Sequence, residues 1–312
     1  MTPATVPTYG DIAKAAALIE PHVRRTPTVD VDVHGHRVTL KLELLQHGGS
    51  FKVRGAFTSV LGATDRPGML VAASGGNHGL AVAYVGHSLG IETRIFVPRS
   101  APDVKVRAIA GLGAEVTQVG DTYAEALIAS REAAGPPGAL ALHAYDALAT
   151  VTGQGTLGSE IAVQVPDVET VLVAVGGGGL LAGVTCGLAG ARPAARVVAV
   201  EPETCATLRR AIGHGGPVEV SVSGVAADAL GASRLGSIAW AVASEHHTSS
   251  LLVGDDAIVE ARQWLWTRTR VAAEPAGAAA FAALLSGAYV PRDAERVCVI
   301  VCGGNADPST LS

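Results

Sequence analysis

Short apolar runs alternate with longer amphipathic segments over most of the chain. The apolar runs predict buried strands, which we expect at 69–73, 94–97, 115–119, 139–142, 170–175, 196–200 and 297–301. The longer segments predict helices, which we expect at 11–23, 80–89, 101–112, 122–134, 180–188, 255–269 and 275–286. Strands that alternate with helices predict parallel sheets covered by helices on both faces.

An early hairpin and two strand-rich blocks complete the expected α/β architecture. Residues 28–33 and 38–42 alternate in polarity around His34-Gly35-His36, a pattern typical of a hairpin. The two blocks predict two doubly wound, mostly parallel sheet domains with a cleft between them. We assign residues 1–46 plus 147–312 to a large domain, and residues 47–146 to a small one.

Three of the expected strands end in glycine-rich turns. These turns are Ser74–Gly79, Gly176–Gly179 and Cys302–Asn305. In open parallel sheets, ligands bind at the carboxyl ends of the strands. The three turns are therefore expected to converge on one site.

The turns at 176–179 and 74–79 each have two interpretations. Glycines 176–179 precede an expected helix, so their backbone N–H groups and the helix N-terminus suit a phosphate. Close packing of helix against strand is the alternative, and the spacing is neither that of a Walker A loop nor G-x-G-x-x-G. The turn at 74–79 offers a hydroxyl, an amide and an imidazole for a carboxylate, or it is a tight turn capped by a serine.

Only four lysines occur, and one of them falls where the two expected lobes join. Lys14 and Lys105 fall on expected helices and should be solvated, whereas Lys41 alternates with apolar residues and should face outward. Lys52 stands at the start of the first strand-helix block. A lysine forms Schiff bases with carbonyl cofactors, and pyridoxal phosphate needs both such a lysine and a phosphate site. That single cofactor would explain both features.

Composition narrows the class of protein. Of the 312 residues 48% are hydrophobic and 16% charged, which is typical of a globular protein with a large core. A net charge of -5 favours neither nucleic acid nor an anionic membrane as partner. We see no signal peptide and no uninterrupted membrane helix. Four widely spaced cysteines match no zinc site or disulfide framework, so a reduced, cytoplasmic protein is expected.

Five motifs in order resemble one family. The segment Ser50-Phe51-Lys52-Val53-Arg54-Gly55-Ala56 resembles the lysine motif of serine/threonine dehydratases, which are pyridoxal-phosphate enzymes of the tryptophan-synthase-β group, fold type II. The S-x-G-N-H turn, the G-G-G-G-L loop, E-P-A-G-A and C-G-G-N follow, so the resemblance runs from about Arg25 to Asn305. It implies a homodimer that converts L-threonine or L-serine to a 2-keto acid and ammonia by α,β-elimination.

The resemblance also implies residue roles. Lys52 would hold the cofactor as a Schiff base and then remove the Cα proton of the substrate. The other cofactor-binding residues would be Phe51 on one ring face, Asn77 at the ring hydroxyl, the phosphate loop Gly176, Gly177, Gly178, Gly179 and Leu180, and Cys302 at the ring nitrogen. The substrate carboxylate would lie at Ser74, Gly75 and His78.

Departures from the family pattern bear on the competing functions. Serine racemases of this family carry a serine where this chain has Gly75, which favours elimination over racemisation. Metal-binding members pair a glutamate with an aspartate six residues on; Glu201 matches the first, but Thr207 takes the second position, so no metal is expected. Glu201 is open to a structural or a site-lining role. Glu274 matches a family motif, and helix N-terminal charge compensation is its alternative role.

The substrate is not fixed by these residues. Members of the family eliminate water from serine, threonine, 3-hydroxyaspartate or phenylserine. The same fold is also compatible with a serine racemase, a β-replacement synthase or an inactive homologue that keeps the cofactor site. Retention of Lys52 with all three turns argues against the inactive protein.

Overall fold

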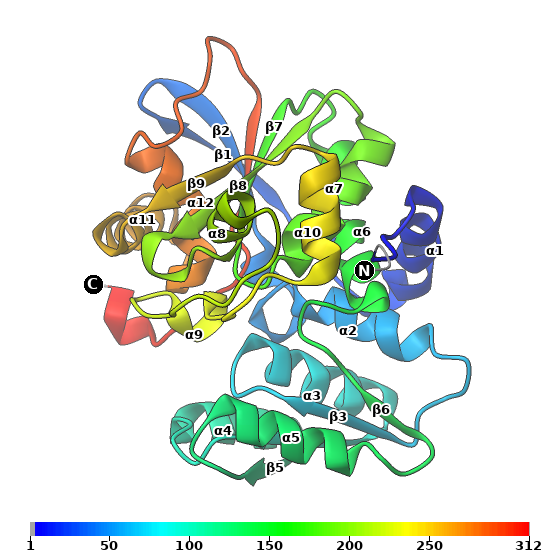
Figure 1. Cartoon of the computed structure of the whole chain (residues 1–312). Coiled ribbons are helices and arrows are strands. Elements are labelled where there is room, and N and C mark those ends of the chain that lie inside the picture. Colours follow the sequence, from blue (N-terminus) through cyan, green and yellow to red (C-terminus); the bar gives the residue numbers. More distant parts are fainter. Residues whose placement is uncertain (1–3, 312) are drawn as a thin grey trace.

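The computed structural model describes residues 4–311, which build two β-sheets flanked by helices (Figure 1). The first sheet has the order β1-β2-β10-β7-β8-β9, with bounds Thr28–Val33, His36–Lys41, Val297–Ile300, Thr170–Ala174, Arg196–Pro202 and Ser250–Val253. The second has the order β5-β4-β3-β6, with bounds Glu115–Gln118, Glu92–Val97, Met69–Ala73 and Ala139–Ala141. Within each sheet every pairing is parallel except that of β1 with β2, which form the expected hairpin.

The helices connect these strands in the manner of a doubly wound protein. In chain order, α1 to α6 span Tyr9–Ile19, Lys52–Leu61, Asn77–Leu89, Asp103–Ala110, Tyr123–Ala133 and Leu148–Gln164. Helices α7 to α12 span Gly179–Ala191, Thr207–His214, Ala227–Leu230, Ser237–Glu245, Asp255–Thr269 and Pro275–Leu285. Among residues 4–311, no helix combines the length and the apolar character that a bilayer crossing requires.

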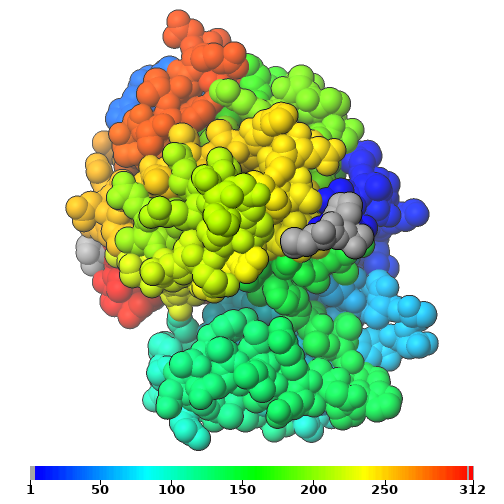
Figure 2. Space-filling model, in the orientation of Figure 1, coloured from blue at the N-terminus to red at the C-terminus, as the bar shows by residue number. Residues whose placement is uncertain are grey.

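The second sheet is inserted between two strands of the first. Its strands lie between residues 69 and 141, whereas β2 ends at Lys41 and β7 begins at Thr170. Figure 2 shows the segment in cyan and green as a separate lobe beneath the rest of the molecule. The expected α/β architecture of two mostly parallel sheets is therefore confirmed. The domain boundaries at 46/47 and 146/147 stay a prediction, and residues 1–3 and 312 lie outside the described part of the chain.

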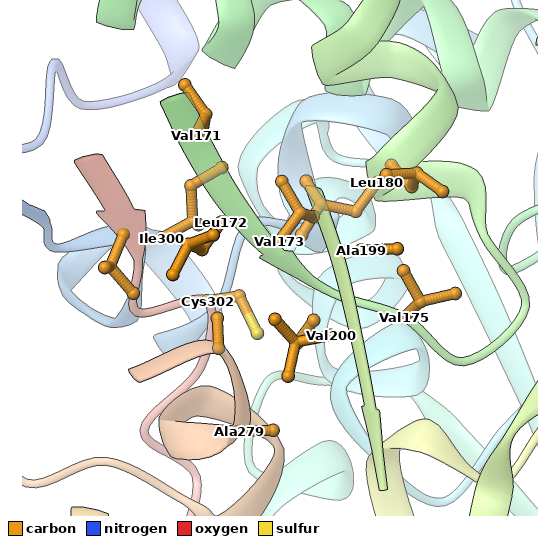
Figure 3. Packing of buried hydrophobic residues seen from close by; sticks show 14 of the residues in the cluster. Val171, Leu172, Val173, Val175, Leu180, Ala199, Val200, Ala279, Ile300 and Cys302 are labelled. Carbon is orange, nitrogen blue, oxygen red and sulfur yellow. The ribbon is translucent and has the colours of Figure 1, made fainter. Parts of the chain in front are cut away.

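Each sheet carries its own hydrophobic cluster. The larger cluster surrounds β7, whose five residues are all buried, and includes Leu180 of α7, Ala279 of α12 and Cys302 after β10 (Figure 3). A second cluster gathers α2, α3, β3 and β4, and a third, small one joins Val71 of β3, Phe96 of β4 and Ala126 of α5. Burial on both faces explains why β7 reads as a continuous apolar run rather than an alternating one.

The expectation that Lys41 faces outward is wrong. Its side chain is fully buried, and its Nζ donates to the carbonyl oxygen of Thr26 at 2.6 Å and to Oε1 of Gln164 at 2.7 Å while pairing with Glu160. Strand β2 pairs with β1 on one side and β10 on the other, and its last four residues are all buried. Alternation of side chains therefore does not predict exposure on this strand, because both faces of the sheet are covered.

Other elements went unpredicted. The sequence pattern missed α2, α6, α8, α9, α10 and β9, and it placed the start of α3 at Leu80 instead of Asn77. Helix α6 is buried along most of its length and contains three glycines, which blur a 3.6-residue period. The first helix ends at Ile19, where a 3-10 turn at Glu20–His22 takes over.

Candidate active site

The residues expected to bind a cofactor line one cavity between the sheets. The Gly176–Gly179 turn follows β7, Cys302 follows β10, Asn77 begins α3 after β3, and Lys52 begins α2. The cavity is lined by Phe51, Lys52, Asn77, Gly176, Gly177, Gly178, Gly179, Leu180 and Cys302. The expectation that the three glycine-rich turns converge is therefore fulfilled in the fold.

Lys52 is held with its amine at the junction of two cavities. Its Nζ donates to the carbonyl oxygen of Ala144 at 2.8 Å, in the connection between β6 and α6. Burial lowers the pKa of Lys52 to about 8, and the neighbouring Cys302 and Glu274 only partly oppose this effect. A larger fraction of the amine is therefore neutral near pH 7 than in a solvated lysine, which suits a nucleophile or a base.

The tetraglycine turn leaves a row of backbone donors without partners in the described protein. The N–H groups of Gly176, Gly177 and Gly178 meet no protein acceptor, and those of Gly179 and Leu180 belong to the first turn of α7, where the helix supplies none. The carbonyl oxygens of the turn, by contrast, do have partners. The Thr207 hydroxyl donates to the Gly176 carbonyl oxygen at 2.5 Å, and the Gly236 N–H donates to the Gly177 carbonyl oxygen at 3.0 Å. A buried set of free N–H groups at a helix N-terminus fits a phosphate.

Close packing also requires glycine in this turn. A Cβ at Gly177 would lie 2.4 Å from the Tyr145 ring, and Gly178 has φ +85° with Ala239 only 2.4 Å from where its Cβ would be. The two interpretations of the turn are therefore compatible: the glycines admit Tyr145 on one side and leave their N–H groups free on the other.

The turn after β3 presents polar groups to a second cavity of about 730 Å³. Ser74, Gly75 and His78 line it together with Lys52. The Ser74 hydroxyl oxygen accepts a hydrogen bond from the Gly76 N–H at 3.2 Å, so the serine caps the turn and also lines the cavity. His78 contacts the carbonyl oxygen of Leu142 through Nε2 at 3.1 Å, and burial lowers its pKa to about 3. Its imidazole is therefore neutral, and its single N–H points at the Leu142 carbonyl oxygen, so the ring has no further N–H to donate to a ligand.

Asn77 is fixed from both sides by side chains that the sequence left without a firm role. Its amide donates to Oε1 of Glu274 at 2.6 Å, and Asn305 donates to its Oδ1 at 2.8 Å. Glu274 precedes α12, as expected for a residue at a helix N-terminus, but its carboxylate reaches into the cofactor cavity. Burial raises the pKa of Glu274 to about 7. A buried carboxyl group that titrates near neutrality lies in direct contact with Asn77.

Cys302 supplies a neutral group at the end of β10. The thiol is buried, its Sγ lies 3.5 Å from the Ala276 carbonyl oxygen, and burial raises its pKa to about 12. The thiol is therefore protonated at neutral pH.

Glu201 is engaged in the fold. Its carboxylate accepts hydrogen bonds from the N–H groups of Leu208 and Arg209 at 2.7 and 2.9 Å and from the Ser250 hydroxyl at 2.5 Å. The Thr207 hydroxyl lies 3.4 Å away. These donors belong to the first turn of α8 and to β9, so Glu201 stabilises the N-terminus of α8 behind the tetraglycine turn.

Sequence reasoning missed most of the residues that line the large cavity, among them Tyr145, Lys105 and Asp228. Lys105 of α4 forms an ion pair with Asp228 of α9, and its side chain is 25% exposed, so the expectation that Lys105 is solvated holds only in part. No local sequence pattern marks Lys105 or Asp228, since α4 and α9 flank different sheets and meet only in the folded chain. Tyr145 could have been suspected, because it closely follows the expected strand at 139–142, and the carboxyl ends of parallel strands form the ligand-binding edge.

Comparisons with known proteins agree with this geometry. A family model described as pyridoxal-phosphate dependent enzyme matches residues 19–303. The chain is 33% identical over 310 residues to the L-threonine ammonia-lyase of Thermotoga maritima, covering 97% of this chain and 77% of that protein. It is 34% identical over 318 residues to the phenylserine dehydratase of Ralstonia pickettii, covering 99% and 96%. The structure resembles maize serine racemase with a TM-score of 0.91 and 30% identity, covering 98% and 96%. Match length and identity together show that this chain belongs to the family of pyridoxal-phosphate dependent enzymes.

Proposed function

We propose that this enzyme is an ammonia-lyase that converts L-threonine or L-serine to a 2-keto acid and ammonia. The observation that carries the proposal is one cavity that combines a lysine of lowered pKa, a row of free N–H groups and a neutral thiol. The relatives named L-threonine ammonia-lyase and L-threonine dehydratase, at 33% and 34% identity, support the reaction class.

The residues of the cavity fit pyridoxal phosphate. Lys52 would hold its aldehyde carbon, residues 176–180 its phosphate, and Asn77 its ring hydroxyl, while Phe51 would lie against the ring. Bound in this way, the cofactor withdraws electrons from the Cα of an attached amino acid. The protonated thiol of Cys302 would meet the ring nitrogen without the negative charge that stabilises a protonated ring. Electron withdrawal is then weaker, which favours prompt loss of a leaving group from Cβ.

The remaining steps fall to side chains around the larger cavity. The Lys52 amine takes the Cα proton, and the Ser74 hydroxyl with the backbone N–H groups of Gly75 and His78 would hold the substrate carboxylate by hydrogen bonds. Breaking the Cα–H and Cβ–O bonds forms a Cα=Cβ double bond and releases the hydroxyl as water. Hydrolysis of the resulting enamine consumes one water and releases ammonia. The sequence of steps needs no oxidant.

Gly75 supports elimination over racemisation. Racemisation needs a second proton donor on the face of Cα opposite Lys52. A Cβ at Gly75 would have Val97 at 3.5 Å and Ala101 at 3.8 Å as its nearest neighbours, and neither side chain carries an exchangeable proton. A racemase would therefore lack an acid at this position.

We also propose that the protein works as a homodimer in the cytoplasm. The expectation of a homodimer rests on the family resemblance. The absence of disulfides among the four described cysteines is compatible with a reducing compartment. Size-exclusion chromatography with light scattering measures the oligomeric state directly.

The test of the reaction is product release from four amino acids. L-Threonine, L-serine, L-threo-3-hydroxyaspartate and phenylserine are incubated with the enzyme and added pyridoxal phosphate, without metal. Equal amounts of keto acid and ammonia from one of them are expected. Lys52→Ala should lose both turnover and the absorption band of the lysine-bound cofactor while keeping its fold, whereas exposed Lys14→Ala should keep both. Full activity in Lys52→Ala would contradict the assignment of the base.

A further inference from the structure

The cavity of about 730 Å³ is larger than threonine or serine requires. Lys52 and the Ser74–His78 turn occupy its inner end, where Cα and the carboxylate of a substrate would lie under the proposed function. Beyond Cβ, threonine carries one methyl group, comparable to the roughly 30 Å³ share of a single water. Pockets that enclose drug-sized ligands measure about 300–1,000 Å³. The cavity is open to solvent and also has to admit part of the cofactor, so its size leaves room for a larger substituent on Cβ without requiring one.

The outer end of the cavity is walled mainly by apolar side chains from both sheets. On one side Ala101, Pro102 and Tyr123 follow the carboxyl ends of β4 and β5. On the other side stand Val220, Val222 and Ala232, in the segments before and after α9. Tyr123 keeps 52% of its surface exposed although it is aromatic, and Tyr145 lines the same cavity. Exposed apolar side chains gathered around a cavity are typical of a ligand-binding wall.

The charged groups of the outer end are already paired. Of the Lys, Arg, Asp and Glu side chains that line the cavity, Lys52 belongs to the chemistry, and Lys105 and Asp228 form an ion pair with each other across the two sheets. A second carboxylate on the substrate would need a free cation in this region. Lys105 is the one cation of this region that could bind such a carboxylate, and it is already paired with Asp228. A substrate with an acidic side chain is therefore disfavoured.

We propose that the preferred substrates are 2-amino-3-hydroxy acids that carry an uncharged apolar group larger than methyl on Cβ, an aromatic ring in particular. The Lys105–Asp228 pair acts as a specificity determinant that excludes a second carboxylate. This inference rests on the proposed elimination reaction and shifts its preferred substrate from threonine or serine to larger amino acids of the same class. The phenylserine dehydratase of Ralstonia pickettii, at 34% identity, has a substrate of this class in its name.

The experiment compares kcat/KM of the holoenzyme for L-threo-phenylserine, L-threonine, L-serine and L-threo-3-hydroxyaspartate. We expect phenylserine to exceed threonine by about tenfold or more, since even one methylene in an apolar pocket is worth about 10–200-fold. A kcat/KM for threonine or serine equal to or above that of phenylserine overturns the inference while leaving the elimination reaction intact. No keto acid from any of the four overturns the proposed function, and the inference with it.

Asp228→Ala tests the ion pair separately. Freed Lys105 should raise kcat/KM for 3-hydroxyaspartate about tenfold, and the Lys105→Ala/Asp228→Ala double variant should lack that gain. The matched control is Asp65→Ala, an exposed aspartate outside the cavity, which should leave the substrate ranking unchanged. An Asp228→Ala enzyme with no gain on 3-hydroxyaspartate overturns the role of the pair.

Discussion

Arg54 lies at the centre of a buried ionic network beneath the helix that carries Lys52. Its guanidinium donates to both carboxylate oxygens of Glu43 at 2.8 Å and to Glu160 at 2.9 Å, while Lys41 pairs with the other oxygen of Glu160. Arg54 is 1% exposed and Glu43 fully buried. Two cations and two anions balance in this network, so the loss of any one member leaves an uncompensated charge inside the protein.

We therefore predict that Arg54→Met strongly destabilises the protein. Methionine keeps much of the aliphatic stem, so the loss comes mainly from the unpaired Glu43 carboxylate. Removal of one partner of a buried pair costs about 3–5 kcal/mol. With an unfolding entropy of about 0.65 kcal/mol per kelvin for a chain of this length, Tm should fall by about 5–8 °C.

Thermal unfolding of the apoprotein measures this change, with Arg37→Met as control. Arg37 pairs with Asp30, but its side chain is 68% exposed, and such surface pairs contribute about 0–1 kcal/mol. Although burial opposes it, Arg54 holds the pKa of Glu43 below its usual range in the wild type. The stability that the ionised Glu43 contributes is therefore fully present above pH 4.5, the ordinary pKa of a glutamate. It is lost as the pH falls below that value toward the lowered pKa of the folded protein. In Arg54→Met, protonation at low pH removes the unpaired charge, so the gap between the two proteins should narrow. A gap below about 1 kcal/mol, or one that does not change between pH 7 and pH 4, would refute the reasoning.

Three further predictions concern the cofactor cavity. Gly177→Ala should weaken pyridoxal phosphate binding and lower Tm, because its Cβ would lie 2.4 Å from the Tyr145 ring; Gly213→Ala, with open space around it, should do neither. Thr207→Val should weaken cofactor affinity by about tenfold, because the buried Gly176 carbonyl oxygen loses its hydrogen-bond donor. Absorbance titration measures the affinity, and Thr207→Ser should keep it near that of the wild type. Equal affinity in all three proteins would contradict a role of the Thr207 hydroxyl. Lys52→Met apoprotein should unfold at a higher temperature than wild-type apoprotein at pH 7. The pKa of Lys52 is about 8 in the folded protein and 10.5 in the unfolded chain, so the unfolded chain binds more protons between these values. The wild type therefore regains stability as the pH rises from 8 to 10.5. A difference in unfolding temperature that persists at pH 10.5 would contradict this direction of the pH dependence.

The sequence by itself determined the architecture and the principal chemistry. The run Val171–Val175 followed by four glycines predicts a buried parallel strand and a backbone turn, since both depend on local composition and chain order. The convergence of three turns followed from the rule that carboxyl ends of parallel strands share one edge. Lys52 stood out because only four lysines occur and this one falls at the start of the first strand-helix block, where the two expected lobes join.

Only the tertiary structure decided the charged contacts between distant elements. Lys41 looked exposed because alternation describes a strand covered on one face, whereas β2 lies within a sheet covered on both. Lys105 and Asp228 are 123 residues apart, and their pairing depends on how the two sheets meet. The spacing of Asn77 and Glu274 along the sequence could not show that their side chains are hydrogen-bonded. The local pattern of apolar and polar residues predicts which segments form helices and strands and which of them are buried. The pairing of buried charges depends instead on how elements remote in sequence pack against one another.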